Sequence, residues 1–197
     1  MKKHASLFAA AFVFMANPAF AHVSPVAHEH SSFAAGFAHP LMGLDHILAM
    51  VAIGVWAAML GGRALIAVPA AFVSVMVLGF VAALAGMPLP FVEPVILASV
   101  VVLGLAIAFA LPVSPLLGAL IAGFFAFFHG HAHGGEIGSA ALLTYGAGFV
   151  LATILLHALG IGLGVGTGRL MTGPAGRWSM RIAGGATALG GLLMMAG

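Results

Sequence analysis

Long stretches of uncharged, apolar residues make up most of this chain of 197 residues. Hydrophobic residues account for 63% of the sequence and charged residues for only 5%, and the mean hydropathy is +1.23. A soluble globular domain has roughly 25% charged residues, because its surface faces water. We therefore expect an all-α integral membrane protein.

The first 21 residues have the pattern of a cleavable signal peptide. Two lysines precede an apolar stretch from Ala5 to Ala16, and small residues follow at Ala19 and Ala21. The alternative, a retained first transmembrane helix, is disfavoured because the stretch is short and ends in a cleavage site. Cleavage would leave His22 at the mature amino terminus. The expected parts are a signal peptide (1–21), a His-rich periplasmic segment (22–38) and a transmembrane domain (39–197).

The chain contains no cysteine, so disulfides and thiolate metal ligands are excluded. A metal site would have to use histidine, carboxylate, methionine or backbone groups. The pI of 9.7 does not argue for nucleic acid, because loss of the two signal lysines leaves arginine and acidic residues in equal number. No nucleotide-binding P-loop is present in the sequence. We expect neither nucleic acid nor nucleotide as a partner, and the oligomeric state is left open.

Interruptions by glycine, proline and charge divide the mature sequence into six apolar segments. A helix needs about 20 residues to cross a bilayer. The last segment is shorter, so its helix is expected to begin before Ile182. The six predicted spans are Pro40–Leu60, Ala64–Ala85, Phe91–Leu111, Leu116–His133, Ser139–Leu163 and Ile182–Gly197.

The arginines give the direction of insertion independently of the number of spans. A cleaved signal places the mature amino terminus outside, so the connections after the first, third and fifth spans lie inside. Arginines concentrate on the cytoplasmic side of membrane proteins. All four arginines fall in or beside those inside connections, at Arg63, Arg169, Arg177 and Arg181.

The motif FHGHAHGGE, Phe128 to Glu136, carries three histidines and a carboxylate. On a helix, His129, His133 and Glu136 share one stripe, whereas His131 points roughly to the opposite side. Two histidines at i and i+4 have the spacing that chelates a metal on one helix face. Ionisable groups inside a bilayer are costly and by default mark a functional path.

A second motif, HPLMGLDH, runs from His39 to His46 and contains Asp45. Pro40 is expected in the first helical turn, with His39 outside the helix. His46 would then lie two turns further along, so the two rings reach one ion only if the chain before Pro40 folds inward. Two successive sites are the alternative. The predicted topology places both motifs in the outer half of the membrane.

Two further histidine positions are candidates. His157, in the fifth span, is expected nearer the cytoplasmic side, either as an inner step of an ion path or as a hydrogen-bonding partner between helices. The stretch HVSPVAHEHSS after the signal is His-rich, and His22 could chelate a metal with the free terminal amine. The alternative is a solvated arm without metal.

The two motifs together resemble the HupE/UreJ family of nickel permeases, in the forms H-x5-D-H and F-H-G-x-A-H-G-x-E. The resemblance implies Ni²⁺ transport, with Co²⁺ as an alternative, across a bacterial inner membrane to serve hydrogenase or urease maturation. It implies no permanently bound cofactor and no enzymatic activity. The predicted metal-contacting residues are His22, His39, Asp45, His46, His129, His133, Glu136 and His157.

Two other functions compete with transport. An intramembrane zinc hydrolase would use His129, His133 and Glu136, although the sequence lacks HExxH. A haem-binding electron carrier would use paired histidines as axial ligands. Nickel, cobalt and zinc are not distinguished by ligand type alone.

Overall fold

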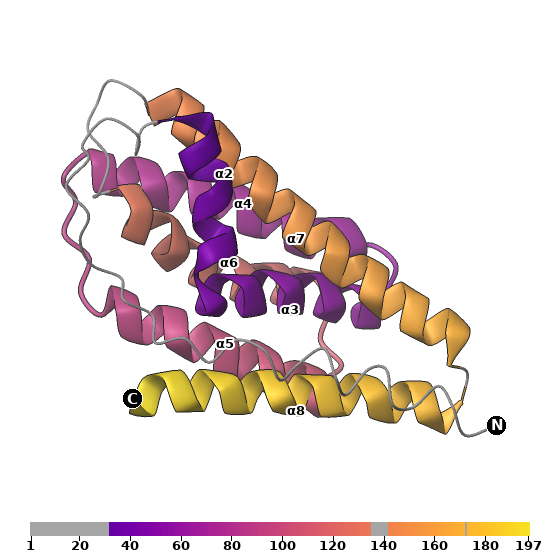
Figure 1. Ribbon diagram of the computed structural model, residues 1–197. Coiled ribbons are helices and arrows are strands. Elements are labelled where there is room, and N and C mark those ends of the chain that lie inside the picture. Colours follow the sequence, from indigo (N-terminus) through magenta and orange to yellow (C-terminus); the bar gives the residue numbers. More distant parts are fainter. Residues whose placement is uncertain (1–31, 135–141, 172) are drawn as a thin grey trace.

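The computed structural model describes residues 32–134, 142–171 and 173–197, and within these ranges it contains helices and no strands (Figure 1). The signal segment, most of the His-rich segment and Glu136 lie outside the described residues. The helices are α2 (Phe33–Met42), α3 (Leu44–Leu60), α4 (Ala64–Leu84), α5 (Val92–Ala108), α6 (Pro115–Gly134), α7 (Leu142–Leu170) and α8 (Pro174–Ala196).

Each predicted span coincides largely with one of the helices α3 to α8. Among the described residues, α4, α6 and α7 are long and apolar enough to cross a membrane, and the bent pair of α2 and α3 would make a fourth span. The molecule is therefore an all-helical membrane protein, while the number of six spans stays a prediction. The last helix begins at Pro174, ahead of Ile182 as expected, whereas α7 continues past the predicted end at Leu163 to Leu170.

The prediction of one continuous helix from Pro40 to Leu60 is wrong. Pro40 lies inside α2, and the chain breaks at Gly43, whose φ of −93° and ψ of 119° are extended. The two helices meet there at 85°. His39 is consequently helical rather than outside the helix. The preference against helix before a proline is overridden because α2 packs along α7.

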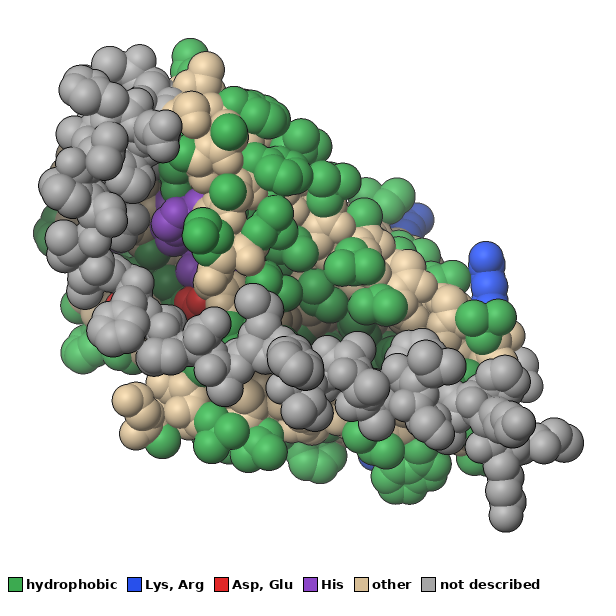
Figure 2. All heavy atoms as spheres, in the orientation of Figure 1, with side chains coloured by type: hydrophobic (Ala, Val, Ile, Leu, Met, Phe, Trp, Pro, Cys, Tyr) green, Lys and Arg blue, Asp and Glu red, His purple; other side chains and the backbone are tan. Residues whose placement is uncertain are grey.

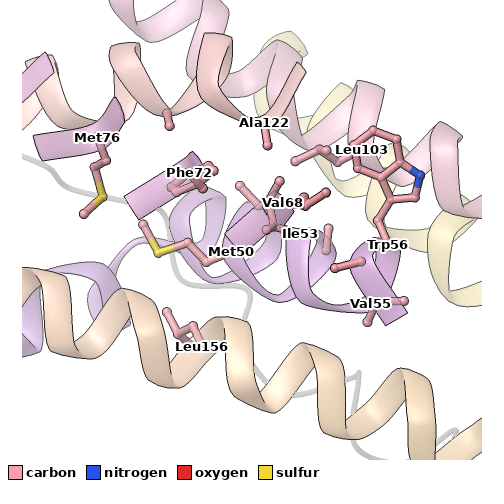
Figure 3. Close-up of a cluster of buried hydrophobic side chains, with 14 of the residues drawn as sticks. Met50, Ile53, Val55, Trp56, Val68, Phe72, Met76, Leu103, Ala122 and Leu156 are labelled. Atoms are coloured by element: carbon pink, nitrogen blue, oxygen red, sulfur yellow. The ribbon is translucent and has the colours of Figure 1, made fainter. Parts of the chain in front are cut away.

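The core is centred on α3, which contacts α4, α5 and α7. Met50, Ile53 and Trp56 of α3 are almost wholly buried, together with Phe72 of α4 and Leu103 of α5 (Figure 3). By contrast, many leucines elsewhere on the helices are exposed, and apolar side chains cover much of the visible surface (Figure 2). This distribution fits helices whose outer faces meet lipid.

Two glycines bring α3 and α7 into backbone contact. A Cβ at Gly54 would collide with the carbonyl oxygen of His157, and one at Gly160 would collide with the carbonyl oxygen of Val51. Small residues permit such close helix crossings in membranes. The crossing fixes His157 beside the middle of α3.

The arginine side chains lie toward one end of the helix bundle, and the histidine and acidic side chains lie toward the other (Figure 2). In Figure 2 the visible histidine and acidic surface lies at one end, and the arginine surface lies toward the other. Arg181 of α8 donates from Nε to the carbonyl oxygen of Ala108, 2.8 Å away at the end of α5. This separation supports the predicted direction of insertion, which itself stays a prediction.

Candidate metal site

Four histidines from three helices form one group, which we call the histidine cluster: His39 of α2, His46 of α3, and His129 and His133 of α6. The ring of His133 lies 4.3 Å from that of His39 and 4.8 Å from that of His46, measured between centroids. The rings of His46 and His129 are 5.0 Å apart. The two sequence motifs therefore meet in space, as predicted.

The bend at Gly43 brings His39 into this group. A regular helix would place His39 and His46 two turns apart, about 10.5 Å along the axis. The bend instead leaves their ring centroids 6.3 Å apart. The sequence required the chain before Pro40 to fold inward for one shared site. The break between α2 and α3 meets this requirement. One shared site is thus favoured over two successive sites.

A side chain at position 43 would collide with neighbouring side chains, which explains the glycine there. A Cβ there would lie 2.7 Å from Oδ1 of Asp45 and 3.0 Å from Nδ1 of His46. The backbone angles at Gly43 suit any residue, so the requirement concerns space rather than conformation. Gly43 therefore allows the Asp45 and His46 side chains to lie over the bend.

A chain of hydrogen bonds orients the cluster. Oδ1 of Asp45 lies 3.0 Å from Nδ1 of His46, and Nε2 of His46 lies 2.7 Å from Nε2 of His133. With neutral imidazoles, His46 donates from Nδ1 to the carboxylate and accepts at Nε2 from His133. His133 then keeps its lone pair at Nδ1, a buried atom with no hydrogen-bond partner among the described residues.

Ser99 of α5 sets the orientation of His129 in the same way. The Ser99 hydroxyl lies 2.6 Å from the carbonyl oxygen of Ile96 and donates its one hydrogen there. His129 Nε2, 3.0 Å from the Ser99 oxygen, must therefore be the donor in that contact. The lone pair of His129 is left on Nδ1, which is buried and has no partner within the described ranges.

Aromatic side chains enclose the cluster. Phe149 of α7 lies 4.9 Å from the His133 ring, and Tyr145 lies 6.1 Å from the His39 ring. Phe72 of α4 lies 5.6 Å from the His129 ring. These residues and Ser99 were not predicted from the sequence. Ser99 offered a signal, because it is the one hydroxyl in the apolar helix 92–108, and Tyr145 is the one tyrosine of the chain.

The other predicted residues lie apart from the cluster or outside the described residues. His131 is half-buried, and its Nε2 donates to the carbonyl oxygen of Met87 at 2.7 Å, in agreement with its predicted direction away from the stripe. His157 is buried and lies against Phe72, with 5.0 Å between ring centroids. His22 and Glu136 lie outside the described residues, so their predicted roles are not tested.

The cluster contains side chains that bind metals, but their donor atoms do not converge on a single position for an ion. Across the three described ranges, no three His, Asp or Glu side chains already form a set that could hold an ion. The reason is that His46 and His133 direct nitrogens at each other, 2.7 Å apart. Two ligands at right angles on one ion are ~2.9 Å apart, given metal–nitrogen bonds of about 2.0–2.1 Å. For both Nε2 atoms to bind one ion, the shared proton would have to move to Nδ1 of His133 and the two rings would have to turn away from each other.

Comparison with known proteins gives the family of this chain. Residues 10–194 match the profile of the family described as HupE / UreJ protein. The chain is 46% identical over 184 residues to Protein HupE of Rhizobium leguminosarum bv. viciae, which covers 93% of this chain and 94% of the relative. No solved structure matches. The chain belongs to the HupE/UreJ family.

Proposed function

We propose that this protein transports Ni²⁺, with Co²⁺ as an alternative, inward across a bacterial inner membrane and thereby supplies the maturation of hydrogenase or urease. The observation that carries the proposal is the histidine cluster, in which four imidazoles and Asp45 meet at one end of an otherwise apolar bundle. Such groups are expensive to place in a membrane and mark ion paths. The family is one of hydrogenase and urease accessory proteins.

The donor atoms suit a borderline divalent ion. Imidazole and carboxylate bind Ni²⁺ and Co²⁺ well, and the absence of cysteine from the sequence argues against a Cu(I) carrier. Asp45 accepts from His46, an arrangement that orients a ligand ring and raises its basicity. His129 and His133 offer lone pairs at Nδ1. Asp45 and Glu136 together would balance the charge of a dipositive ion in a low-dielectric environment.

Transport also needs a driving force and a means of release. No nucleotide site is evident in the sequence, so the ion gradient, the membrane potential or trapping in the cytoplasm would drive the movement. A divalent ion gains about 4.6 kcal/mol per 100 mV on moving inward, twice the value for a single charge. Binding at each step must be weak enough to permit exit. His22 and the other amino-terminal histidines would gather metal before it enters.

The haem-binding alternative conflicts with the cluster geometry. Two axial histidines lie on opposite faces of a haem, so their nitrogens are about 4 Å apart, twice a metal–nitrogen bond of about 2 Å. The facing nitrogens of His46 and His133 are 2.7 Å apart, in direct hydrogen-bonding contact. A porphyrin has no room between them.

Uptake into vesicles tests the proposal. Purified protein reconstituted into lipid vesicles should accumulate Ni²⁺, and accumulation should increase when the interior is made negative. Parallel assays with Co²⁺ and Zn²⁺ would establish the selectivity. His129→Ala provides the matched control, because it removes one buried imidazole of the cluster. Equal metal entry into protein-free vesicles, wild-type vesicles and His129→Ala vesicles would refute the proposal.

A further inference from the structure

His157 is a buried histidine whose ring nitrogens make no hydrogen bond. The residue is 2% exposed, and neither Nδ1 nor Nε2 has a hydrogen-bond partner among the described residues. Its ring meets the Phe72 ring edge-on, at 5.0 Å and 87°. An aromatic face is at most a weak acceptor for the single N–H of a neutral imidazole. The second nitrogen keeps an unused lone pair, so the predicted alternative of a hydrogen-bonding link between helices has no support here.

Two further donor atoms lie in the same α4–α7 contact as this ring, one turn away from it along each helix. Thr153 lies one turn before His157 on the same face of α7, and its hydroxyl is 3.7 Å from Sδ of Met76. Met76 follows Phe72 by one turn on α4, so the pair Phe72 and Met76 faces the pair Thr153 and His157. Figure 3 shows Met76, Phe72 and Met50 next to one another, opposite the helix that carries Leu156.

His157 lies next to the histidine cluster, separated from it by the Phe72 ring. Phe72 lies 5.6 Å from the His129 ring and 5.0 Å from the His157 ring, measured between centroids. One aromatic side chain therefore contacts both an imidazole of the cluster and His157. His157 is the next buried imidazole along the bundle, beside the α3–α7 crossing at Gly54.

We propose that His157, the Met76 thioether and the Thr153 hydroxyl form a second, inner site for a borderline divalent cation. The proposal rests on the transport function, in which this site would receive the ion from the cluster. An imidazole nitrogen and a thioether sulfur suit Ni²⁺ or Co²⁺ rather than Mg²⁺ or Ca²⁺. Methionine is flexible, so its sulfur can turn toward an arriving ion. All three donors are neutral, so the inner site binds weakly and releases readily.

Ni²⁺ binding to the purified full-length protein is the first test. Equilibrium dialysis over a range of Ni²⁺ concentrations should show a weak binding phase in the wild type that is lost in His157→Leu. X-ray absorption at the nickel edge near saturation should show a sulfur neighbour that Met76→Leu removes. Met194→Leu, on α8, is the matched control and should leave the sulfur signal intact. Methionine-to-leucine changes conserve volume and therefore preserve packing.

Uptake kinetics provide the second test. His157→Leu should lower the maximal rate at saturating Ni²⁺ by about tenfold or more, with little change in the concentration that gives half the maximal rate. His157→Gln keeps one donor atom and should retain more activity; it also serves in the binding test if His157→Leu does not fold.

Two results would overturn the inner site: equal Ni²⁺ binding by wild type and both His157 variants, or a nickel spectrum of the wild type without sulfur. Wild-type vesicles that take up no metal would refute transport instead. In that case loss of the weak phase in His157→Leu would still establish a metal site there.

Discussion

The histidine cluster and the surroundings of His157 differ in how their imidazoles are held. In the cluster, His46 lies between Asp45 and His133, and His129 bonds to Ser99, so each of these rings has a fixed tautomer. His157 lies against the Phe72 ring, near Thr153 and Met76, and has no hydrogen bond among the described residues. The cluster suits capture of a hydrated ion. Its oriented imidazoles replace the water ligands that the ion loses, and the Asp45 carboxylate balances the positive charge. His157, a neutral imidazole with no hydrogen-bonded carboxylate, would bind the ion more weakly and let it pass on.

The largest effect is expected from the carboxylate of the cluster. Asp45→Asn removes the negative charge 3.0 Å from His46 Nδ1 while keeping the size of the side chain. Uptake should fall to background, because the hydrated ion gives up its water at this entry site and would do so without a negative charge to compensate. We expect the same of His46→Ala, His129→Ala and Glu136→Gln, each measured in vesicles at matched protein levels. Near-normal Ni²⁺ uptake by Asp45→Asn would show that the cluster does not need the carboxylate to capture the ion.

A smaller effect is expected from Ser99, which acts only through His129. Ser99→Ala removes the oxygen that holds His129 Nε2 at 3.0 Å, so the His129 lone pair is no longer confined to Nδ1. Loss of such a supporting partner typically costs about 10–100-fold in metal affinity. The half-saturating Ni²⁺ concentration should therefore rise, while the maximal rate changes less.

The conservative variant Ser99→Thr separates orientation from packing. It keeps a hydroxyl and should restore most of the affinity for Ni²⁺, even though its extra methyl group perturbs the helix contact. Equal affinity of the alanine and wild-type proteins would mean that Ser99 serves packing alone.

A still smaller effect is expected from the amino-terminal histidines. Deleting residues 23–31 removes two histidines and one glutamate and keeps Ser32, the N-cap of α2. A His-rich arm can raise the local metal concentration without forming the path, so uptake should drop only at scarce metal. An equal loss at saturating metal would place these residues in the path itself. The intact mass of the purified protein would also show whether the mature chain begins at His22.

Most of the fold could be predicted from hydrophobicity, because in a membrane the apolar segments and their charged flanks dominate the energy. The α2–α3 bend could not. We attribute it to the packing of α2 on α7, which is a contact between distant parts of the chain, and to the Asp45 and His46 side chains that occupy the space above Gly43. Local rules for Pro40 pointed instead to a helix start.

The site was predictable to the extent that it follows helix periodicity. His129 and His133 share a face because of their spacing, and their meeting with His46 followed from opposite helix directions. Ser99 and Phe72 escaped notice because their roles depend on which helices pack together. A lone serine in an apolar helix is nevertheless a usable signal, since membrane helices place few polar groups without a partner.

Helix geometry predicts that His131, unlike the other histidines of its motif, takes no part in metal binding. It lies in the same motif as His129 and His133, yet it is only half-buried and donates to the carbonyl oxygen of Met87. His131→Ala should therefore change Ni²⁺ uptake by less than about twofold, because its described partners are the Met87 carbonyl and the Phe127 ring rather than the histidine cluster. His129→Ala, two residues away, is the matched comparison and should abolish uptake, because His129 is wholly buried in the cluster. A defect in His131→Ala as deep as that in His129→Ala would mean that the ion path runs along the His131 side of α6, and the distinction between the histidine cluster and His131 would fail.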